Sequence, residues 1–246
     1  MTTAPVIAVV GASGGIGTTT LAGALAIRHA AESGMATIVD GSPHGGLDIW
    51  FGAELTPGPR WSDLSGLRGT VDPMVLVDRL PTACGVRVMS NGRPSGNSWS
   101  PGPPDPERRA VLAALREVST LVIVDGGRYD PAAWWLTAYK QPVCRLHVLL
   151  VGASSHSLAC GPLARRSLPD SDVVLALSGR RASDELGALL GESVDEDVVA
   201  IIRPERRIGR HLRIGRPPRI DPHGSLGRAA GDILSELDEL TAEEFP

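Results

Sequence analysis

A glycine-rich segment directly behind the first apolar run constrains this chain more than any other feature. Residues 6–10 have the length and composition of a buried strand, and residues 11–20 then read G-A-S-G-G-I-G-T-T-T ahead of an apolar helical pattern. Where a strand, a glycine turn and a helix start follow one another, free backbone N–H groups and the positive end of the helix dipole converge, and glycine lets an anion approach closely. The segment therefore predicts a phosphate-binding loop, the alternative being a purely structural tight turn.

Short apolar runs alternate with helical patterns along the rest of the chain, which is typical of a parallel sheet covered by helices. Strands are expected at residues 6–10, 36–40, 86–90, 121–125, 146–151, 173–177 and 198–202. Helices are expected at residues 18–32, 105–118, 131–139, 155–167, 184–190 and 205–214, and a last one at about 225–240. We predict an α/β protein with a three-layer α/β/α fold, a mostly parallel sheet of about seven strands and a single domain over residues 1–246.

Two glycine- and proline-rich segments interrupt this alternation. Residues 41–59 directly follow a predicted strand end, so we expect them to form a functional loop, which lies within residues 40–64. Residues 92–106 are richer still in proline and are expected to be an exposed loop before a helix.

Composition narrows the class of protein. The net charge of −4 gives no general reason to expect nucleic acid as a partner. The three cysteines have no metal-ligand spacing and are expected to be reduced thiols. No apolar run reaches the roughly 18–20 residues that cross a bilayer, and the N-terminus lacks the basic region of a signal peptide. We therefore expect a cytoplasmic protein without direct membrane insertion.

The glycine-rich loop allows two interpretations. In one, it resembles the T-G-x-x-x-G-x-G turn of short-chain dehydrogenases, matched by Gly11, Gly15 and Gly17, with Asp40 where these enzymes hold an NAD ribose. The catalytic Y-x-x-x-K pair of that family has no match, because neither Tyr129 nor Tyr139 has a lysine four residues on. An NAD(P)-dependent oxidoreductase stays as a second alternative.

In the other interpretation, the loop resembles the deviant Walker A motif of the MinD/ParA ATPases, K-G-G-x-G-K-T-T. The aligned residues are Ser13, Gly14, Gly15, Ile16, Gly17, Thr18, Thr19 and Thr20. The three glycines and both trailing threonines match, whereas Ser13 and Thr18 replace the two lysines. Lys140, the only lysine of the chain, lies far along the sequence.

Downstream residues strengthen the second resemblance. Residues 40–48 read D-G-S-P-H-G-G-L-D, and residues 60–64 read R-W-S-D-L, similar to the switch I region of the CpaE/TadZ branch of the MinD/ParA family. The resemblance assigns Gly45, Gly46 and Asp48 to a switch or interface segment. Asp125, at the end of an apolar run, matches the Walker B aspartate, and residues 215–217 resemble a G-R-P element of the same relatives.

The resemblance implies a nucleotide site built by Gly11 and residues 13–20. It would take ATP or ADP with Mg²⁺ held by Thr19, Asp40 and Asp125, and Asp40 would be catalytic if the protein is active. Because a loop lysine stabilises charge on the phosphates and in the transition state, its loss predicts weak or absent nucleotide binding and hydrolysis at or near zero.

The family implies a role in localisation or assembly, for a pilus or secretion machine or for septum placement. Such a protein would act through protein partners, form a homodimer and be recruited to the pole or septum. A working ATP–Mg²⁺ switch is the first alternative to this inactive form.

The segment 203–219 is rich in arginine, and Arg206, Arg207, Arg210 and Arg213 form a candidate basic face. This face is explained by simple solvation, by an acidic protein partner or, less favoured, by nucleic acid. The acidic C-terminal helix argues against binding to anionic lipid. The pair Trp134 and Trp135 is expected either at an interface or buried against the sheet.

Overall fold

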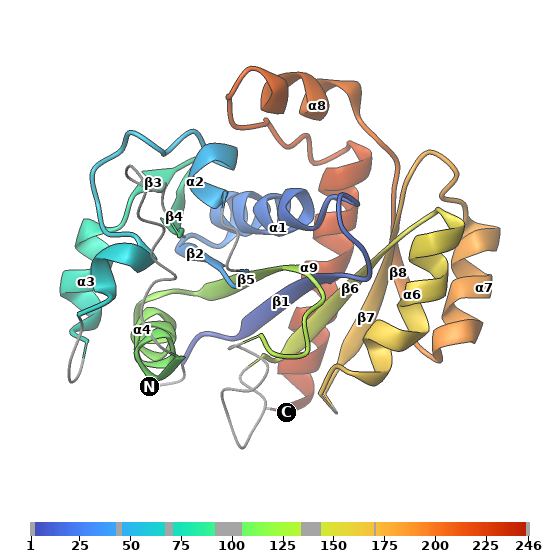
Figure 1. Ribbon diagram of the computed structural model, residues 1–246, viewed down its shortest axis with the longest axis horizontal. Coiled ribbons are helices and arrows are strands. Elements are labelled where there is room, and N and C mark those ends of the chain that lie inside the picture. Colours follow the sequence, from blue (N-terminus) through green and yellow to red (C-terminus); the bar gives the residue numbers. More distant parts are fainter. Residues whose placement is uncertain are drawn as a thin grey trace.

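The computed structural model describes residues 3–42, 46–66, 71–91, 105–133, 144–169 and 171–244. Within them, eight strands form one sheet in the order β3-β4-β2-β5-β1-β6-β7-β8 (Figure 1). The strands are β1 (Val6–Gly11), β2 (Ala36–Asp40), β3 (Thr82–Ala83), β4 (Val86–Met89), β5 (Leu121–Arg128), β6 (Leu146–Gly152), β7 (Val173–Ser178) and β8 (Val198–Ile202). The predicted three-layer α/β/α fold with a mostly parallel sheet is confirmed.

Helices cover both faces of this sheet (Figure 1). The helices are α1 (Thr18–Glu32), α2 (Leu47–Trp50), the 3-10 helix η1 (Trp61–Leu64), α3 (Pro73–Arg79), α4 (Asp105–Val118), α6 (Ser155–Arg166), α7 (Asp184–Val194), α8 (Arg206–Arg213) and α9 (Ser225–Glu244). One buried cluster contains side chains of α1, α2, α8 and α9, and the other contains side chains of α3, α4, α6 and α7.

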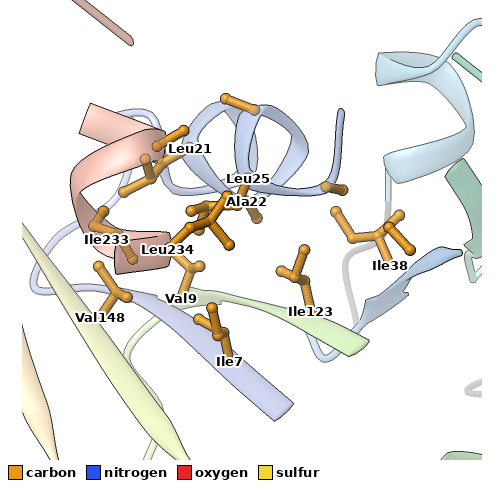
Figure 2. Close-up of a cluster of buried hydrophobic side chains, with 14 of the residues drawn as sticks. Ile7, Val9, Leu21, Ala22, Leu25, Ile38, Ile123, Val148, Ile233 and Leu234 are labelled. Carbon is orange, nitrogen blue, oxygen red and sulfur yellow. The ribbon is translucent and has the colours of Figure 1, made fainter. Parts of the chain in front are cut away.

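The packing of α1 and α9 on the sheet fixes the start of α1. Figure 2 shows Leu21 and Leu25 of α1 and Ile233 of α9 gathered above Ile7 and Val9 of β1, and all five side chains are fully buried. Each such side chain contributes about 1.5–3 kcal/mol by its removal from water. The N-terminal turn of α1 is thereby held at the carboxyl end of β1.

The strand order places the candidate site. All neighbouring strands run parallel except β3, which pairs antiparallel with β4. Strand β1 lies between β5 and β6, with β2 to β5 on one side of it and β6 to β8 on the other, so the strand order changes direction at β1. Ligands of open α/β sheets bind outside the carboxyl ends of the strands at such a switch point. The glycine-rich loop lies there.

The predicted elements differ from the structure in a few places. Strand β3 was missed because its two residues are too short for an alternating pattern. Helices α2, α3 and η1, within residues 41–79, were also missed because they are too short to display a helical pattern. The first residues of the predicted helix 131–139 form a turn, in which the Asp130 carboxylate accepts the N–H of Ala132 at 2.9 Å. Its remainder and Trp134, Trp135 and Lys140 lie outside the described residues.

Two other expectations concern the described residues. Among them, no helix has both the length and the apolar character that crossing a bilayer demands. All three cysteines are free thiols. Most of the predicted proline-rich loop, residues 92–104, and Gly45 of the switch-like segment fall outside the described part of the chain.

Candidate nucleotide site

The glycine-rich loop takes a backbone path that only glycine adopts without strain. Gly15 and Gly17 have φ angles of 75° and 102°, in the region that L side chains disfavour. At Gly11, a Cβ would collide with the Thr18 hydroxyl, so the loop also needs glycine for close packing. Gly11, Gly15 and Gly17 therefore each have a structural reason, whereas a Cβ at Gly14 would meet no neighbouring atom within 4 Å.

The first turn of α1 offers free donors to an anion. Gly17 precedes the helix and supplies no capping side chain, and the turn contains no acidic residue. The N–H groups of such a turn have no partner within the helix, and the helix dipole adds partial positive charge there. The geometry of the loop thus fits the phosphate cradle predicted from the sequence.

Both positions where the related motif has lysine hold short side chains that face the protein interior. Ser13 is buried, and its hydroxyl donates to the Ser157 hydroxyl at 2.8 Å. Thr18 is buried against Gly11. Neither side chain extends over the loop toward the place of a phosphate. The described residues contain no lysine, since Lys140 lies outside them.

Two aspartates and a threonine meet at the carboxyl ends of β2 and β5. Asp40 and Asp125 are neighbours in register across the two strands, and both are nearly fully buried. Burial raises the pKa of Asp125, while hydrogen bonds from the Thr19 side chain and from the Gly127 N–H, the latter 3.1 Å long, lower it. The predicted group Thr19, Asp40 and Asp125 is thus gathered in one place.

Asp40 is the more strongly perturbed carboxyl. Burial raises the pKa of Asp40 well above its usual range, and the nearby charge of Asp125 adds to the increase. The N–H of Asn91 donates to Asp40 Oδ2 at 2.9 Å, and this hydrogen bond opposes the increase in the pKa of Asp40. A divalent cation beside the two carboxyls would relieve this repulsion.

These residues fit Mg²⁺ only in combination with a nucleotide. The described residues hold no cluster of three or more His, Cys, Asp or Glu side chains that would bind a metal alone. Mg²⁺ in nucleotide sites commonly takes one or two carboxylates, water and phosphate oxygens. Thr19, Asp40 and Asp125 would supply the protein's share, and the cation would neutralise phosphate charge.

The R-W-S-D-L element holds the switch-like segment onto the sheet. The buried Arg60 guanidinium donates to the carbonyls of Gly58 at 2.8 Å and Ala53 at 2.9 Å, and its Nε lies 3.8 Å from Asp48 Oδ2. Trp61 Nε1 donates to the carbonyl of Asp40 at 3.1 Å. Sequence reasoning recognised this element by resemblance; the structure gives it a positioning role for the end of β2.

The start of α2 places the remaining switch residues. Gly46 precedes α2 with a φ of 123°, and Asp48 is buried in its first turn. Farther along the chain, Pro217 of the predicted G-R-P element packs against Gly52, where an added Cβ would lie 3.0 Å from its Cδ. The segment that follows α8 in the sequence is thus in contact with Gly52, within the switch-like loop.

A cleft of about 950 Å³ opens beside the glycine-rich loop, and sequence reasoning missed it. It runs from Gly15 and Gly17 across the ends of β6, β7 and β8 and under α8. Arg180, Arg181 and Arg203 line it, and each follows the carboxyl end of a strand. The position of these arginines directly after predicted strand ends was the sequence signal for the cleft, because the carboxyl edge of the sheet also carries the phosphate loop.

The predicted basic face lies on the outer side of α8. Arg206, Arg207, Arg210 and Arg213 are all exposed, whereas Ile208 is buried beneath them and lines the cleft. The four arginines therefore do not belong to the candidate nucleotide site. They form a separate cationic surface above it.

The sheet order and the helices on both faces define a class of fold, the three-layer α/β/α fold of P-loop NTPases. Within this class the chain has the fold of the ParA and MinD ATPases. It is similar to a ParA family ATPase from Chlorobium tepidum, with a TM-score of 0.75 and 17% identity over 93% of this chain and 98% of that one.

Two further solved structures support the same fold. The MinD cell division protein of Aquifex aeolicus has a TM-score of 0.69 and 14% identity, covering 96% of this chain and 97% of its own, and it has also been solved in complex with MinC. The ATP complex of a McdA variant from Cyanothece has a TM-score of 0.68 and 16% identity, covering 98% of each chain.

Sequence comparison reaches only part of the chain. No family model matches it. An uncharacterized protein found in two strains of Mycobacterium tuberculosis is 37% identical over 121 residues, which are 49% of this chain and 32% of that protein. The matched region thus spans about a third of the relative's length.

Proposed function

We propose that this chain is a MinD/ParA-like localisation or assembly factor that binds ATP weakly at most, hydrolyses it at or near zero and acts by binding other proteins. The observation that carries this proposal is the inward placement of Ser13 and Thr18 at the two lysine positions. Without a lysine at either position, no side chain of the loop itself neutralises charge that develops on the phosphates during transfer.

The partners follow from the family resemblance. The chain would form a cytoplasmic homodimer that is recruited to the pole or septum. Its partners there would belong to a pilus or secretion machine, or to the apparatus that places the septum. MinD of Aquifex aeolicus forms a complex with MinC, which supports a mode of action through protein binding. The exposed arginines Arg206, Arg207, Arg210 and Arg213 offer a surface for an acidic partner; nucleic acid is the less favoured occupant.

A working ATP–Mg²⁺ switch is the second candidate, because the contact between Thr19 and Asp125 beside Asp40 retains the residues for Mg²⁺.

The dehydrogenase interpretation has less support. In the dinucleotide-binding order the first two strands are neighbours, whereas here β5 lies between β1 and β2. Asp40 is also buried beside Asp125, and its Oδ2 already accepts the N–H of Asn91.

The proposal is tested by titration calorimetry of ATP–Mg²⁺ together with a phosphate-release assay. We expect weak or undetectable heat and no release above the protein-free rate. A turnover of about one per second that Asp40→Ala abolishes would overturn the proposal and establish the switch instead. Melting curves with ATP or NADPH separate the third candidate, because a ligand that binds only the folded protein raises the melting temperature.

A further inference from the structure

The cleft beside the phosphate loop has two chemically different ends. At one end lie the backbone groups of residues 15–17 and the start of α1. At the other end lie Arg180 and Arg181, which follow β7, and Arg203, which follows β8; β7 and β8 are the second and third strands from β1, whose carboxyl end carries the loop. The wall between them is mostly apolar and is formed by Ile16, Leu150, Leu158, Ile202, Ile208 and Leu212.

The arginine end carries positive charge that the described residues do not neutralise. None of the three guanidinium groups has an ion-pair partner in the described part of the chain. Arg203 Nε donates to the Ala182 carbonyl at 3.3 Å, which holds its side chain at the cleft. The one acidic residue of the lining, Glu205, accepts the N–H of Leu226 at 2.8 Å at the start of α9.

This distribution of charge differs from what a simple 5′-nucleotide requires. All of the phosphates of ATP or ADP lie at one end of the molecule, so a ligand seated on the loop would leave the arginine end facing an uncharged base. Guanidinium groups bind phosphate through paired N–H donors and are the side chains best suited to it. The cationic groups that the loop lacks are therefore present, but at the far end of the same cleft.

We propose that the cleft selects a nucleotide that carries anionic groups at both ends, with a 5′-phosphate on the loop amides and a second phosphate on Arg180, Arg181 and Arg203. The volume of about 950 Å³ accommodates such a ligand, since small-molecule pockets span about 300–1,000 Å³. The apolar wall takes the sugar and base. This proposal rests on the loop as a phosphate site, as the proposed function does.

Two isomers make a matched pair of probes. ADP and adenosine 3′,5′-bisphosphate contain the same atoms, but only the second has phosphates on two different carbons of the ribose. We expect calorimetry without Mg²⁺ to give a Kd at least about tenfold lower for the bisphosphate. The double variant Arg180→Gln/Arg181→Gln should lose this preference, and Arg79→Gln, an exposed arginine on α3 outside the cleft, should keep it.

The experiments test the two-ended ligand and the proposed function separately. Equal affinity for the isomers, no binding of the bisphosphate, or a preference that survives in the double variant would each overturn the two-ended ligand. The comparison of the two isomers on the wild-type protein tests the proposal even if the double variant folds poorly. Arg203→Gln provides a second variant in a different loop. Phosphate release from ATP would instead overturn the proposed function while leaving the isomer preference to stand on its own.

Discussion

The hydroxyl of Ser13 donates a hydrogen bond of 2.8 Å to the hydroxyl of Ser157, which in turn accepts the N–H of Gly152 at 2.8 Å. This buried chain joins the glycine-rich loop to the turn between β6 and α6. Ser13 stands at one of the two positions where the related motif has lysine. In this protein the same position instead fastens the loop to its own fold.

Ser157→Ala tests this connection. The change leaves two buried donors, the Ser13 hydroxyl and the Gly152 N–H, without their acceptor, so we expect a loss of about 1–3 kcal/mol in the free energy of unfolding. Urea unfolding measures it. Ser155→Ala on the exposed side of the same helix is the control, with an expected change within about 0.5 kcal/mol. Equal effects from both variants would show that the hydrogen-bonded chain contributes nothing specific.

Thr18→Lys tests whether the missing charge limits nucleotide binding. Thr18 is the first residue of α1 and is buried against Gly11, at a position where the related motif has lysine, so the longer lysine side chain would extend outward from this site to reach a phosphate on the loop. A charge-assisted hydrogen bond to phosphate is worth about 1.5–3 kcal/mol, so we expect ATP affinity to rise about 10–100-fold in calorimetry.

Thr18→Met is the matched control, because methionine has a similar length and no charge. If it binds ATP as tightly as the lysine variant, then packing and not charge governs the loop, and our explanation of the weak site is wrong.

Asp40→Asn tests the buried carboxyl pair through the pH dependence of stability. Because the pKa of Asp40 is raised on folding by burial and by Asp125, the folded state holds a proton that the unfolded state releases. The resulting stability is present at low pH and is lost as the pH rises through the folded-state pKa. We expect the variant to be more stable than the wild type toward neutral pH, with a flatter profile.

Urea unfolding at several values from about pH 5 to 8 gives the two profiles. Glu192→Gln, at an exposed position on α7, is the control and should parallel the wild type. Parallel profiles for Asp40→Asn would mean that Asp40 carries no raised pKa.

Arg60→Met tests the anchor of the switch-like segment. The change removes donors to the carbonyls of Ala53 and Gly58 and leaves Asp48 buried without its counter-ion, which costs about 3–5 kcal/mol. Urea unfolding is the measurement, with exposed Arg79→Met as the control. Adding Asp48→Leu to Arg60→Met should recover part of the loss; a further loss instead would contradict the pairing.

Local patterns predicted much of the fold. The bounds of β2, β8, α1 and α4 follow from runs of apolar residues and from helix-start signals, and the structure confirms them. The glycines of the loop were predicted from the close approach of an anion, whereas the structure adds a different reason for Gly15 and Gly17, namely their positive φ angles. Helices α2 and α3 were not predicted, because segments of four and seven residues hold too few turns to display a helical period.

The sequence by itself determined the alternation of strands and helices, the glycine loop and the absence of lysine from it, because each is a property of neighbouring residues. Only the tertiary structure decided that Ser13 reaches Ser157, that Asp40 lies beside Asp125, and that Arg180 and Arg203 share one cleft with the loop. These residues lie far apart in sequence, and the order of strands in the sheet sets which of their ends meet. That order arises from packing of the two helical layers over the whole sheet, so short-range patterns do not contain it.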